Sequence, residues 1–242
     1  MAGTFDRGIV EKIVRDVLRD FQRDQNASGD DRVASPLKVN VSARHIHLCP
    51  GDFEALFGKG ARPTPFRPLY QEGHFAANET VTLIGPKSRM ITGLRLLGPL
   101  REHSQVELAF TDVILLGIEN VPVRMSGDLE GTPGAWIMGP AGMLELEQGV
   151  IRAALHVHMN ERDAARMGVV HRGLMELRVE GDAPVVFERV HVRVDPTFKL
   201  EVHMDTDEAN ACHLAAAKHV SLTVPKGKSD IPGDVINKGV HS

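Results

Sequence analysis

The sequence has 242 residues, of which 42% are hydrophobic, and its 28 basic and 32 acidic side chains give a formal net charge of −4. This size allows one large or two small domains with substantial cores. Interspersed charges and an aromatic content of 5% argue against nucleic acid as a partner. Because two cysteines provide no disulfide framework and no apolar run reaches membrane-spanning length, we expect a cytosolic protein that is neither secreted nor membrane-spanning.

The N-terminal segment predicts an amphipathic helix on a tether. From Phe5 to Phe21, apolar residues recur at helical spacing and charged residues lie opposite them. The stretch that follows, up to Pro36, is polar and rich in Asn, Ser, Gly and Asp, which favours a flexible linker. We expect a docking helix over residues 1–22 and a linker over 23–36; a helix that folds back onto the domain is the alternative.

Two H-x-H pairs, His45 with His47 and His156 with His158, are the most informative feature. Twelve histidines in a chain of this length produce about 0.6 such pairs by chance. On a strand, alternate side chains share a face with Cα atoms about 6.6 Å apart, a spacing that suits two ligands of one zinc ion. The two pairs predict two halves of one metal site, and histidines that are solvated or satisfied in a core are the alternative.

Both pairs also share their sequence context. Asp52 and Asp163 each fall five residues after the second histidine and open a helical pattern, over Pro50–Phe57 and Asn160–Met167. A duplicated unit explains this better than coincidence.

Short segments of strand length, separated by Gly and Pro, fill most of the remaining chain. Many short strands with few helices favour β-barrels over a doubly wound sheet. In chain order we expect strands over 37–47, Thr80–Ile84, Met90–Leu97, Gln105–Phe110, Val113–Ile118, Ala135–Met138, Leu174–Val179, Val185–Val194 and Phe198–Met204.

The last of these strands places His203 just before a helix start. Asp205 and Glu208 have the spacing of a capping box, which predicts a helix from Ala209 to His219. A histidine at this position can bind a metal, and a helix N-terminus can accept anionic groups. Residues 226–242 are expected to form an extended tail.

Several of these motifs together resemble the PduL-type phosphate propanoyltransferases (phosphotransacylases) of bacterial microcompartments. The resemblance covers about residues 37–225, in order. It rests on Val41-Ser-Ala-Arg-His-Ile-His-Leu48, Gly73-His-Phe-Ala-Ala-Asn-Glu-Thr-Val-Thr-Leu83, Leu97-Gly-Pro-Leu-Arg101, Ser126-Gly-Asp-Leu-Glu-Gly-Thr-Pro-Gly134, Ala153-Ala-Leu-His-Val-His-Met159 and His203-Met-Asp-Thr-Asp-Glu-Ala-Asn210.

The resemblance implies a mainly β fold: two antiparallel β-barrels related by a pseudo-twofold internal duplication, with short capping helices and a tethered N-terminal amphipathic helix. The first repeat would span 37–149 and the second 150–225, with the first strand, 37–47, exchanged between barrels. It further implies a homo-oligomer in the bacterial cytoplasm, within a microcompartment, whose N-terminal helix contacts the shell or other cargo.

The resemblance also implies a site with two Zn²⁺ ions, beside which CoA binds. Arg101 would bind phosphate, because a guanidinium offers paired donors to an oxyanion. The implied metal ligands are His45, His47, Glu107, His156, His158 and His203, and the implied CoA-binding residues are Ser42, Arg67, Arg95, Leu97, His203 and Asn210. Glu107 would share a strand face with Gln105, although a lone strand glutamate is more often solvated, and Arg67 and Arg95 are equally well explained as surface charges.

Three positions depart from the family pattern: Arg67 replaces a lysine, His74 a glutamine and Cys49 a serine. We interpret Cys49 as a helix-start residue, with a third metal ligand or a redox-sensitive thiol as the alternative.

The expected activity is the interconversion of acyl-CoA and phosphate with acyl phosphate and CoA, with propanoyl-CoA as the expected substrate. No serine elbow or cysteine–base pair is evident, which favours direct transfer over a covalent acyl-enzyme. The alternatives are a zinc-dependent acyl-CoA thioesterase or other zinc hydrolase, and a zinc-binding adaptor without catalysis.

Overall fold

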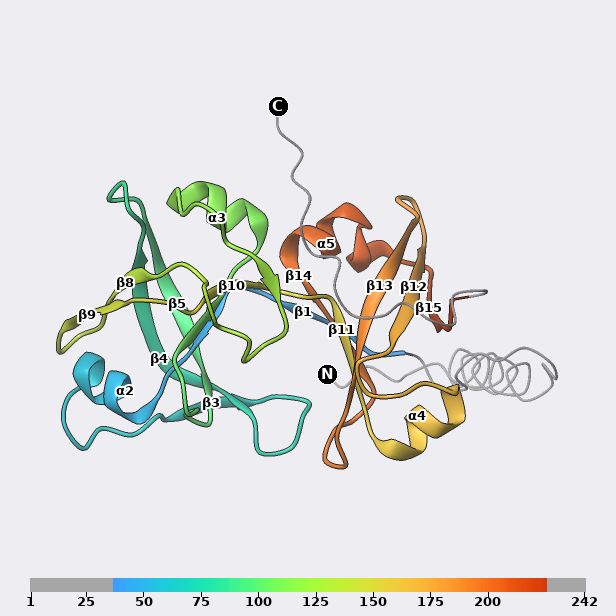
Figure 1. The fold of residues 1–242 in the computed structure, drawn as a ribbon, viewed down its shortest axis with the longest axis horizontal. Coiled ribbons are helices and arrows are strands. Elements are labelled where there is room, and N and C mark those ends of the chain that lie inside the picture. Colours follow the sequence, from blue (N-terminus) through green and yellow to red (C-terminus); the bar gives the residue numbers. More distant parts are fainter. Residues whose placement is uncertain (1–36, 226–242) are drawn as a thin grey trace, which may run out of the picture. The chain divides into compact units, whose positions relative to one another are not determined.

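The structure, a computed structural model, describes residues 37–225, which are mainly β with few helices and form two curled half-barrel sheets (Figure 1). The helix expected over residues 1–22, the linker over 23–36 and the tail over 226–242 lie outside the described residues. Among the helices of residues 37–225, none is long and apolar enough to cross a membrane.

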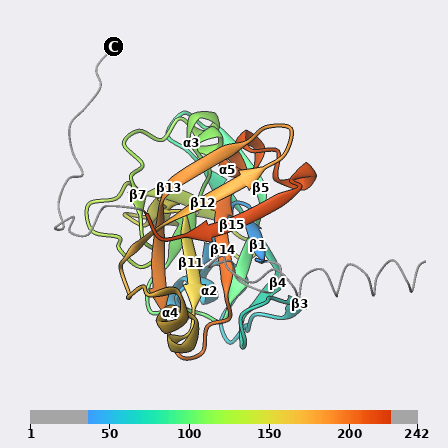
Figure 2. The same ribbon diagram turned by 90° about the vertical axis from the view of Figure 1, so that its right-hand side faces the viewer.

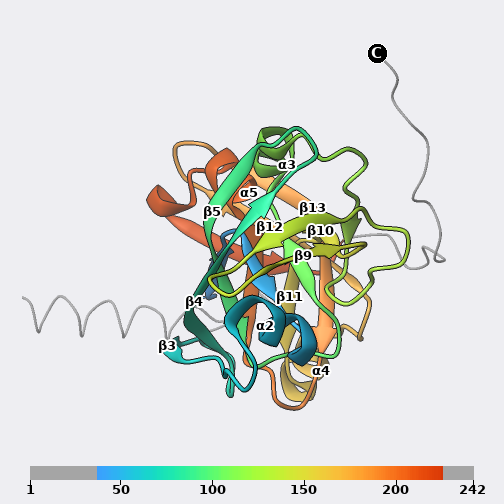
Figure 3. The ribbon, with the colours of Figure 1, turned by 90° about the vertical axis from the view of Figure 1, so that its left-hand side faces the viewer.

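The first sheet takes its strands from one continuous stretch, residues 45–153, whereas the second combines residues 39–42 with strands from residues 156–223 (Figures 2 and 3). The first sheet contains β2 (His45–His47), β3 (Pro65–Pro68), β4 (Phe75–Ile84), β5 (Met90–Gly98), β6 (Gln105–Glu107), β7 (Val123–Arg124), β8 (Ala135–Met138), β9 (Met143–Leu146) and β10 (Val150–Ala153). The second sheet contains β1 (Val39–Ser42), β11 (His156–Met159), β12 (Leu174–Glu180), β13 (Val185–Val194), β14 (Glu201–Asp205) and β15 (His219–Thr223). The helices are α2 (Pro50–Phe57), α3 (Phe110–Leu116), α4 (Glu161–Met167), α5 (Thr206–Ala211) and the 3₁₀ helix η1 (Leu214–Ala216).

Six strands of each sheet pair in the same order and with the same directions. The first sheet runs β10, β6, β2, β5, β4, β8, and the second runs β1, β14, β11, β13, β12, β15. In both, the successive pairings are parallel, antiparallel, parallel, antiparallel and antiparallel. Helices follow equivalent strands too, since α2 and α4 follow β2 and β11, and α3 and α5 follow β6 and β14.

The chain crosses between the sheets just before each H-x-H pair. β1 pairs with β14 in the second sheet, whereas β2, two residues later, pairs with β5 and β6 in the first. Likewise β10 pairs with β6 in the first sheet and β11, again two residues later, with β13 and β14 in the second. The single strand expected over 37–47 is therefore two strands, because Ala43 and Arg44 carry the chain from one sheet to the other.

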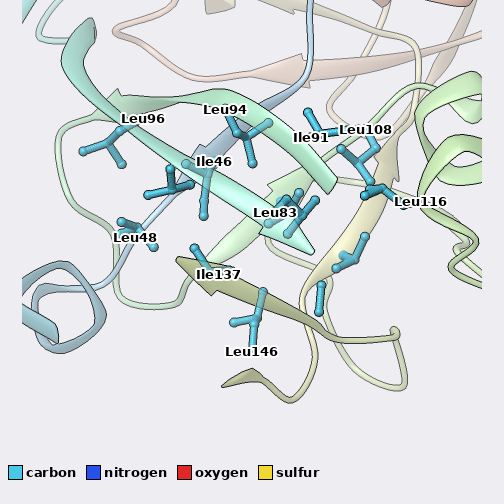
Figure 4. Packing of buried hydrophobic residues seen from close by; sticks show 14 of the residues in the cluster. Ile46, Leu48, Leu83, Ile91, Leu94, Leu96, Leu108, Leu116, Ile137 and Leu146 are labelled. Atoms are coloured by element: carbon cyan, nitrogen blue, oxygen red, sulfur yellow. The ribbon is translucent and has the colours of Figure 1, made fainter. Parts of the chain in front are cut away.

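Each sheet encloses its own hydrophobic core. In the first, Ile46, Leu83, Leu94 and Leu96 are fully buried (Figure 4). The second is built in the same way on residues of β11 to β14, with Val157 of the second H-x-H pair at its centre. The residue between the histidines is thus a core anchor in both sheets, which points both imidazoles of each pair to the opposite face.

Two expected elements are wrong. Val113–Ile118, predicted as a strand, lies largely within α3, and the strand expected over Gln105–Phe110 ends at Glu107. A short continuous apolar run does not distinguish a strand from a buried helix. Here Asp112 favours the helix, because its carboxylate accepts a hydrogen bond from the backbone N–H of Ala109 at the helix start.

The helix expected from Ala209 to His219 is also wrong beyond Ala211. The capping box is present, with Asp205 accepting the N–H of Glu208 and Glu208 accepting that of Asp205, so α5 begins at Thr206. His213, with a left-handed φ of 46°, separates α5 from the short 3₁₀ helix η1, so no continuous helix reaches β15. The preceding strand starts only at Glu201. By contrast, the predicted α2, α4, β8 and β13 are confirmed.

The start of α5 gives a test of stability against pH. Burial and the nearby Asp205 charge raise the pKa of Glu208 to about 7, although the capping hydrogen bond opposes this. Because the folded state then holds a proton that the unfolded chain releases above its ordinary pKa of 4.5, stability falls as pH rises through this window. Glu208→Gln keeps an oxygen for the cap, so we expect its melting midpoint to exceed the wild type by roughly 2–4 °C at pH 8 and to match it near pH 5. Glu161→Gln, in the first turn of α4, is the control and should show no such pH-dependent difference.

Candidate functional site

His45, His47 and Glu107 form the first cluster of metal-ligating groups, with one ligand atom from each within 4.8 Å of the others. Antiparallel pairing of β2 with β6 sets His45 directly opposite Glu107. Nε2 of His45 lies 3.3 Å from the Glu107 carboxylate and Nε2 of His47 lies 3.8 Å from it. All three side chains are buried. His45 and His47 share one face of β2, and the register with β6 sets Glu107 beside them.

His156, His158 and His203 form the second cluster by the same construction. Antiparallel pairing of β11 with β14 sets His156 opposite His203, at the position that Glu107 occupies in the first sheet. The three ring centroids lie 4.4 to 4.9 Å apart. Sequence reasoning predicted that all six of these residues would gather at one site, and the structure brings them into two triads.

Hydrogen bonds orient the imidazoles for metal binding. His45 and His156 each contact, through Nδ1, the backbone carbonyl two residues earlier, at 2.8 and 2.7 Å, and His47 contacts that of Leu97 at 3.1 Å. A ring that donates its Nδ1–H to a carbonyl presents the lone pair of Nε2 to the triad. This arrangement, imidazole fixed from behind by a carbonyl, is typical of histidines that bind metal.

In the second triad, buried nitrogens lack partners within residues 37–225. Neither ring nitrogen of His158 forms a hydrogen bond, and Nε2 of His203 lies 3.1 Å from the Glu201 carboxylate without hydrogen-bond geometry. Unsatisfied buried polar atoms are costly. Because three such nitrogens and a set of N and O donors suit zinc, the residues of both triads fit two Zn²⁺ ions.

The charge states of the histidines in the second triad agree with this fit, whereas in the first triad, although burial opposes it, the neighbouring Glu107 raises the pKa of His45. Burial, and then the neighbouring His203, lower the pKa of His156 to about 3, and burial lowers the pKa of His158 as well. A neutral imidazole is the form that binds metal. In the first triad, burial opposes but the neighbouring histidines, above all His45, hold the pKa of Glu107 well below its ordinary value, so the carboxylate is ionised and available as a ligand.

The two triads face one another. One small cavity is lined by Glu107 of the first triad and by His156 and His203 of the second. Ser42, a predicted CoA-binding residue, lines the same cavity. The triads are therefore parts of a single centre at the crossing of the two sheets.

Arg101 is joined to the first triad through Ser126. Its backbone N–H donates to Leu48 directly after the H-x-H pair, and its Nη1 donates to the Ser126 hydroxyl at 2.9 Å. Ser126 in turn donates to Oε1 of Glu107 at 3.0 Å, and Gln105 donates to both Ser126 and Glu107. Gln105 and Glu107 therefore share a face, as predicted, and the guanidinium is held beside the first triad.

The other predicted CoA-binding residues divide into two groups. Arg95 is the strand partner of His45, donates to the carbonyl of Ala77 and lies over the Phe66 ring. Leu97 follows two residues later, with its carbonyl on His47. Arg67 on β3 and Asn210 on α5 are exposed, and no contact among the described residues joins either to a triad.

Sequence reasoning missed several residues that contact the centre. Ser126 and Gln105 support Glu107 and Arg101, and Asn40 of β1 pairs with His203 and lies 3.4 Å from its Nδ1. Ser126 is the first residue of a motif, residues 126–134, on which the family resemblance rests, and this motif could have identified it. Asn40 had none, because its contact depends on the exchange of β1 into the second sheet.

Cys49 begins α2 as predicted. It is the N-cap residue, and its backbone N–H donates to the Ser104 hydroxyl, which bonds the Asp52 carboxylate. Its thiol belongs to neither metal-ligating group of residues 37–225. The helix-start interpretation is confirmed.

Comparisons with known proteins identify the family. The family model described as phosphate propanoyltransferase matches residues 38–215. The chain is 49% identical over 233 residues to the phosphate propanoyltransferase of Planctopirus limnophila, covering 94% of this chain and 95% of the relative. It is 50% identical over 177 residues to that of Thermotoga maritima (73% and 83% covered) and 44% identical over 207 residues to that of Salmonella typhimurium (85% and 92% covered). The match spans both histidine triads, Arg101 and Ser126, and the chain belongs to the phosphate propanoyltransferase family.

Proposed function

We propose that this protein is a phosphotransacylase that interconverts acyl-CoA and phosphate with acyl phosphate and CoA, with propanoyl-CoA as a substrate. The names of its relatives support the acyl group and the phosphate acceptor. The observation that carries the proposal is the position of Arg101, which Ser126 ties to the ionised Glu107 beside two facing triads. A metal centre with an adjacent guanidinium suits the transfer of an acyl group to phosphate.

In this proposal Arg101 binds phosphate through its paired N–H groups and orients one oxygen toward the thioester carbonyl. The phosphate oxygen forms the new C–O bond, the C–S bond breaks, and CoA leaves as a thiolate with the electron pair. A Zn²⁺ ion in each triad would supply Lewis-acid polarisation and stabilisation of the thiolate. The reverse reaction joins CoA thiolate and acyl phosphate through the same contacts.

Direct transfer is favoured because the site offers no activated nucleophile. The Ser126 hydroxyl donates to Glu107, but its oxygen accepts hydrogen bonds from Arg101 and Gln105, which occupy the lone pairs that a nucleophile needs. The Cys212 thiol is buried and donates to a backbone carbonyl in α5. We therefore propose a ternary complex without an acyl-enzyme.

The competing reaction is hydrolysis of acyl-CoA, and phosphate dependence separates the two. We expect the purified protein to release CoA from propanoyl-CoA only when phosphate is present, with one acyl phosphate formed for each CoA. Incubation with a chelator should abolish this release and added Zn²⁺ should restore it. Rapid CoA release without phosphate would instead identify a thioesterase.

We also propose that residues 37–149 and 150–225 are duplicated repeats that exchange their first strands. The matching strand order, pairing directions and helix positions of the two sheets support this. The amphipathic pattern of residues 1–22 supports a helix that docks on a shell or other cargo of a bacterial microcompartment, with a homo-oligomeric enzyme as cargo. Deleting residues 1–36 should leave the transferase activity intact and abolish this association.

A further inference from the structure

Arg193 on β13 lies beside the second triad and has no role in the function proposed above. In the parallel pairing of β11 with β13, Arg193 is the direct partner of His158. Paired residues of neighbouring strands project from the same face of a sheet, so the Arg193 side chain shares the face of the metal centre. Its positive charge lowers the pKa of both His156 and His158, which agrees with this position.

Phe198 lies beside both His158 and the Arg193 side chain. The Phe198 ring stacks on the imidazole of His158, with centroids 4.0 Å apart and planes 17° from parallel. The guanidinium carbon of Arg193 lies 5.7 Å from the centroid of the same ring. A cation against an aromatic face keeps its N–H groups directed away from the ring, available to other partners.

Within residues 37–225, no acidic side chain is bound to this guanidinium. No carboxylate oxygen lies within 4.0 Å of it, and it forms no side-chain hydrogen bond. The nearby Asp195 carboxylate instead accepts two hydrogen bonds from Thr197, at 2.6 and 2.9 Å. A partly buried arginine without a protein anion is therefore poised for an anion from solution.

Arg193 is paired with His158 of the second triad, Arg101 is tied through Ser126 to Glu107 of the first, and residues of both triads line one cavity. Burial lowers the pKa of Arg101, Glu107 opposes this, and the Arg193 charge lowers the pKa further, which agrees with this placement. The equivalent position of the first sheet is Leu97, two residues after the partner of His45, so the strand pairing itself does not require a charge here. Two converging guanidiniums are unfavourable alone and favourable around a dianion.

We propose that Arg193 is a second anion-binding residue of the centre, which donates hydrogen bonds to the phosphoryl oxygens of inorganic phosphate or acyl phosphate opposite Arg101. This inference rests on the proposed function for the identity of the anion. CoA also carries phosphate groups, so the test separates the two sources.

The test compares Arg193→Gln and Arg193→Lys with the wild type and with Arg189→Gln, an exposed arginine on the same strand. For Arg193→Gln we expect the KM for phosphate to rise about tenfold while the KM for propanoyl-CoA changes less than twofold, and we expect partial rescue by Lys. The control should leave both constants unchanged. Zinc content, measured by atomic emission, should equal the wild type in all variants.

A binding measurement makes the result independent of turnover. Phosphate should raise the melting midpoint of the wild type, and Arg193→Gln should need about tenfold more phosphate for the same rise. A higher KM for propanoyl-CoA with an unchanged KM for phosphate would assign Arg193 to CoA and overturn the inference, as would unchanged phosphate binding. If Arg193→Gln does not fold, Arg193→Lys decides by the same criteria. A wild type that binds phosphate but forms no acyl phosphate would refute the proposed function while leaving the Arg193 comparison valid.

Discussion

Replacing His158 with alanine is expected to remove one of two zinc equivalents, to lower activity by at least about 100-fold, and to leave the protein folded. The physical reason is that neither ring nitrogen of His158 has a hydrogen-bond partner within residues 37–225. Loss of the ring therefore removes a metal ligand and no described hydrogen bond. Zinc per chain, measured by atomic emission after gel filtration, should fall from about two to about one.

Thermal unfolding with and without a chelator supplies a second readout. A bound metal stabilises the folded state by mass action, so chelation should lower the melting midpoint of the wild type more than that of His158→Ala. The exposed His103 is the matched control, and His103→Ala should keep both zinc equivalents and the full response to chelator. If His158→Ala retains two equivalents, the second triad is a core histidine cluster and not a metal site.

The four histidines of the H-x-H pairs were predictable as candidate metal ligands because their signal is local, whereas Glu107 rested on the family resemblance. In a strand the H-x-H spacing itself places two imidazoles on one face, and the aspartates five residues later mark helices that are indeed α2 and α4. The alternation of apolar and polar residues in β13 is also a local signal, and the predicted bounds of this strand are those observed. Where a pattern was ambiguous, as in the apolar run of α3, a single polar residue at the helix start settled the structure.

Residues whose role depends on strand register could not be found in this way. Arg193 meets His158, and Asn40 meets His203, only because β13 and β1 pair with particular strands of the second sheet. Nothing in the spacing of residues 37–47 indicates that the chain changes sheets at Ala43. A local sequence pattern therefore reveals the two H-x-H pairs. It does not reveal the residues around them, because their positions depend on long-range strand pairing.

Removal of the Arg101 guanidinium is expected to give the largest specific effect on phosphate. Arg101→Ala should lower kcat/KM for phosphate by at least about 100-fold, because a hydrogen bond to a charged group contributes about 1.5–3 kcal/mol and this residue can form two. Zinc content should stay at the wild-type level, since within residues 37–225 the hydrogen bonds that connect Arg101 to the first triad pass through Ser126. Normal phosphate kinetics in Arg101→Ala would disprove its role.

Replacing Ser126 is expected to have a smaller effect on phosphate than replacing Arg101, because both residues belong to the same hydrogen-bond network. Ser126→Ala removes the acceptor for Arg101 and one donor to Glu107 but keeps both charges, so we expect a five- to tenfold rise in the KM for phosphate, roughly 1 to 1.4 kcal/mol, with little change in kcat. Ser126→Thr retains the hydroxyl and should recover most of the affinity. Arg178→Ala, on an exposed position of β12, should leave both constants unchanged. Arg101 is still present in this variant but binds phosphate less tightly, so the KM for phosphate should change more than kcat. A purely structural role of Ser126 would instead lower zinc content and kcat together.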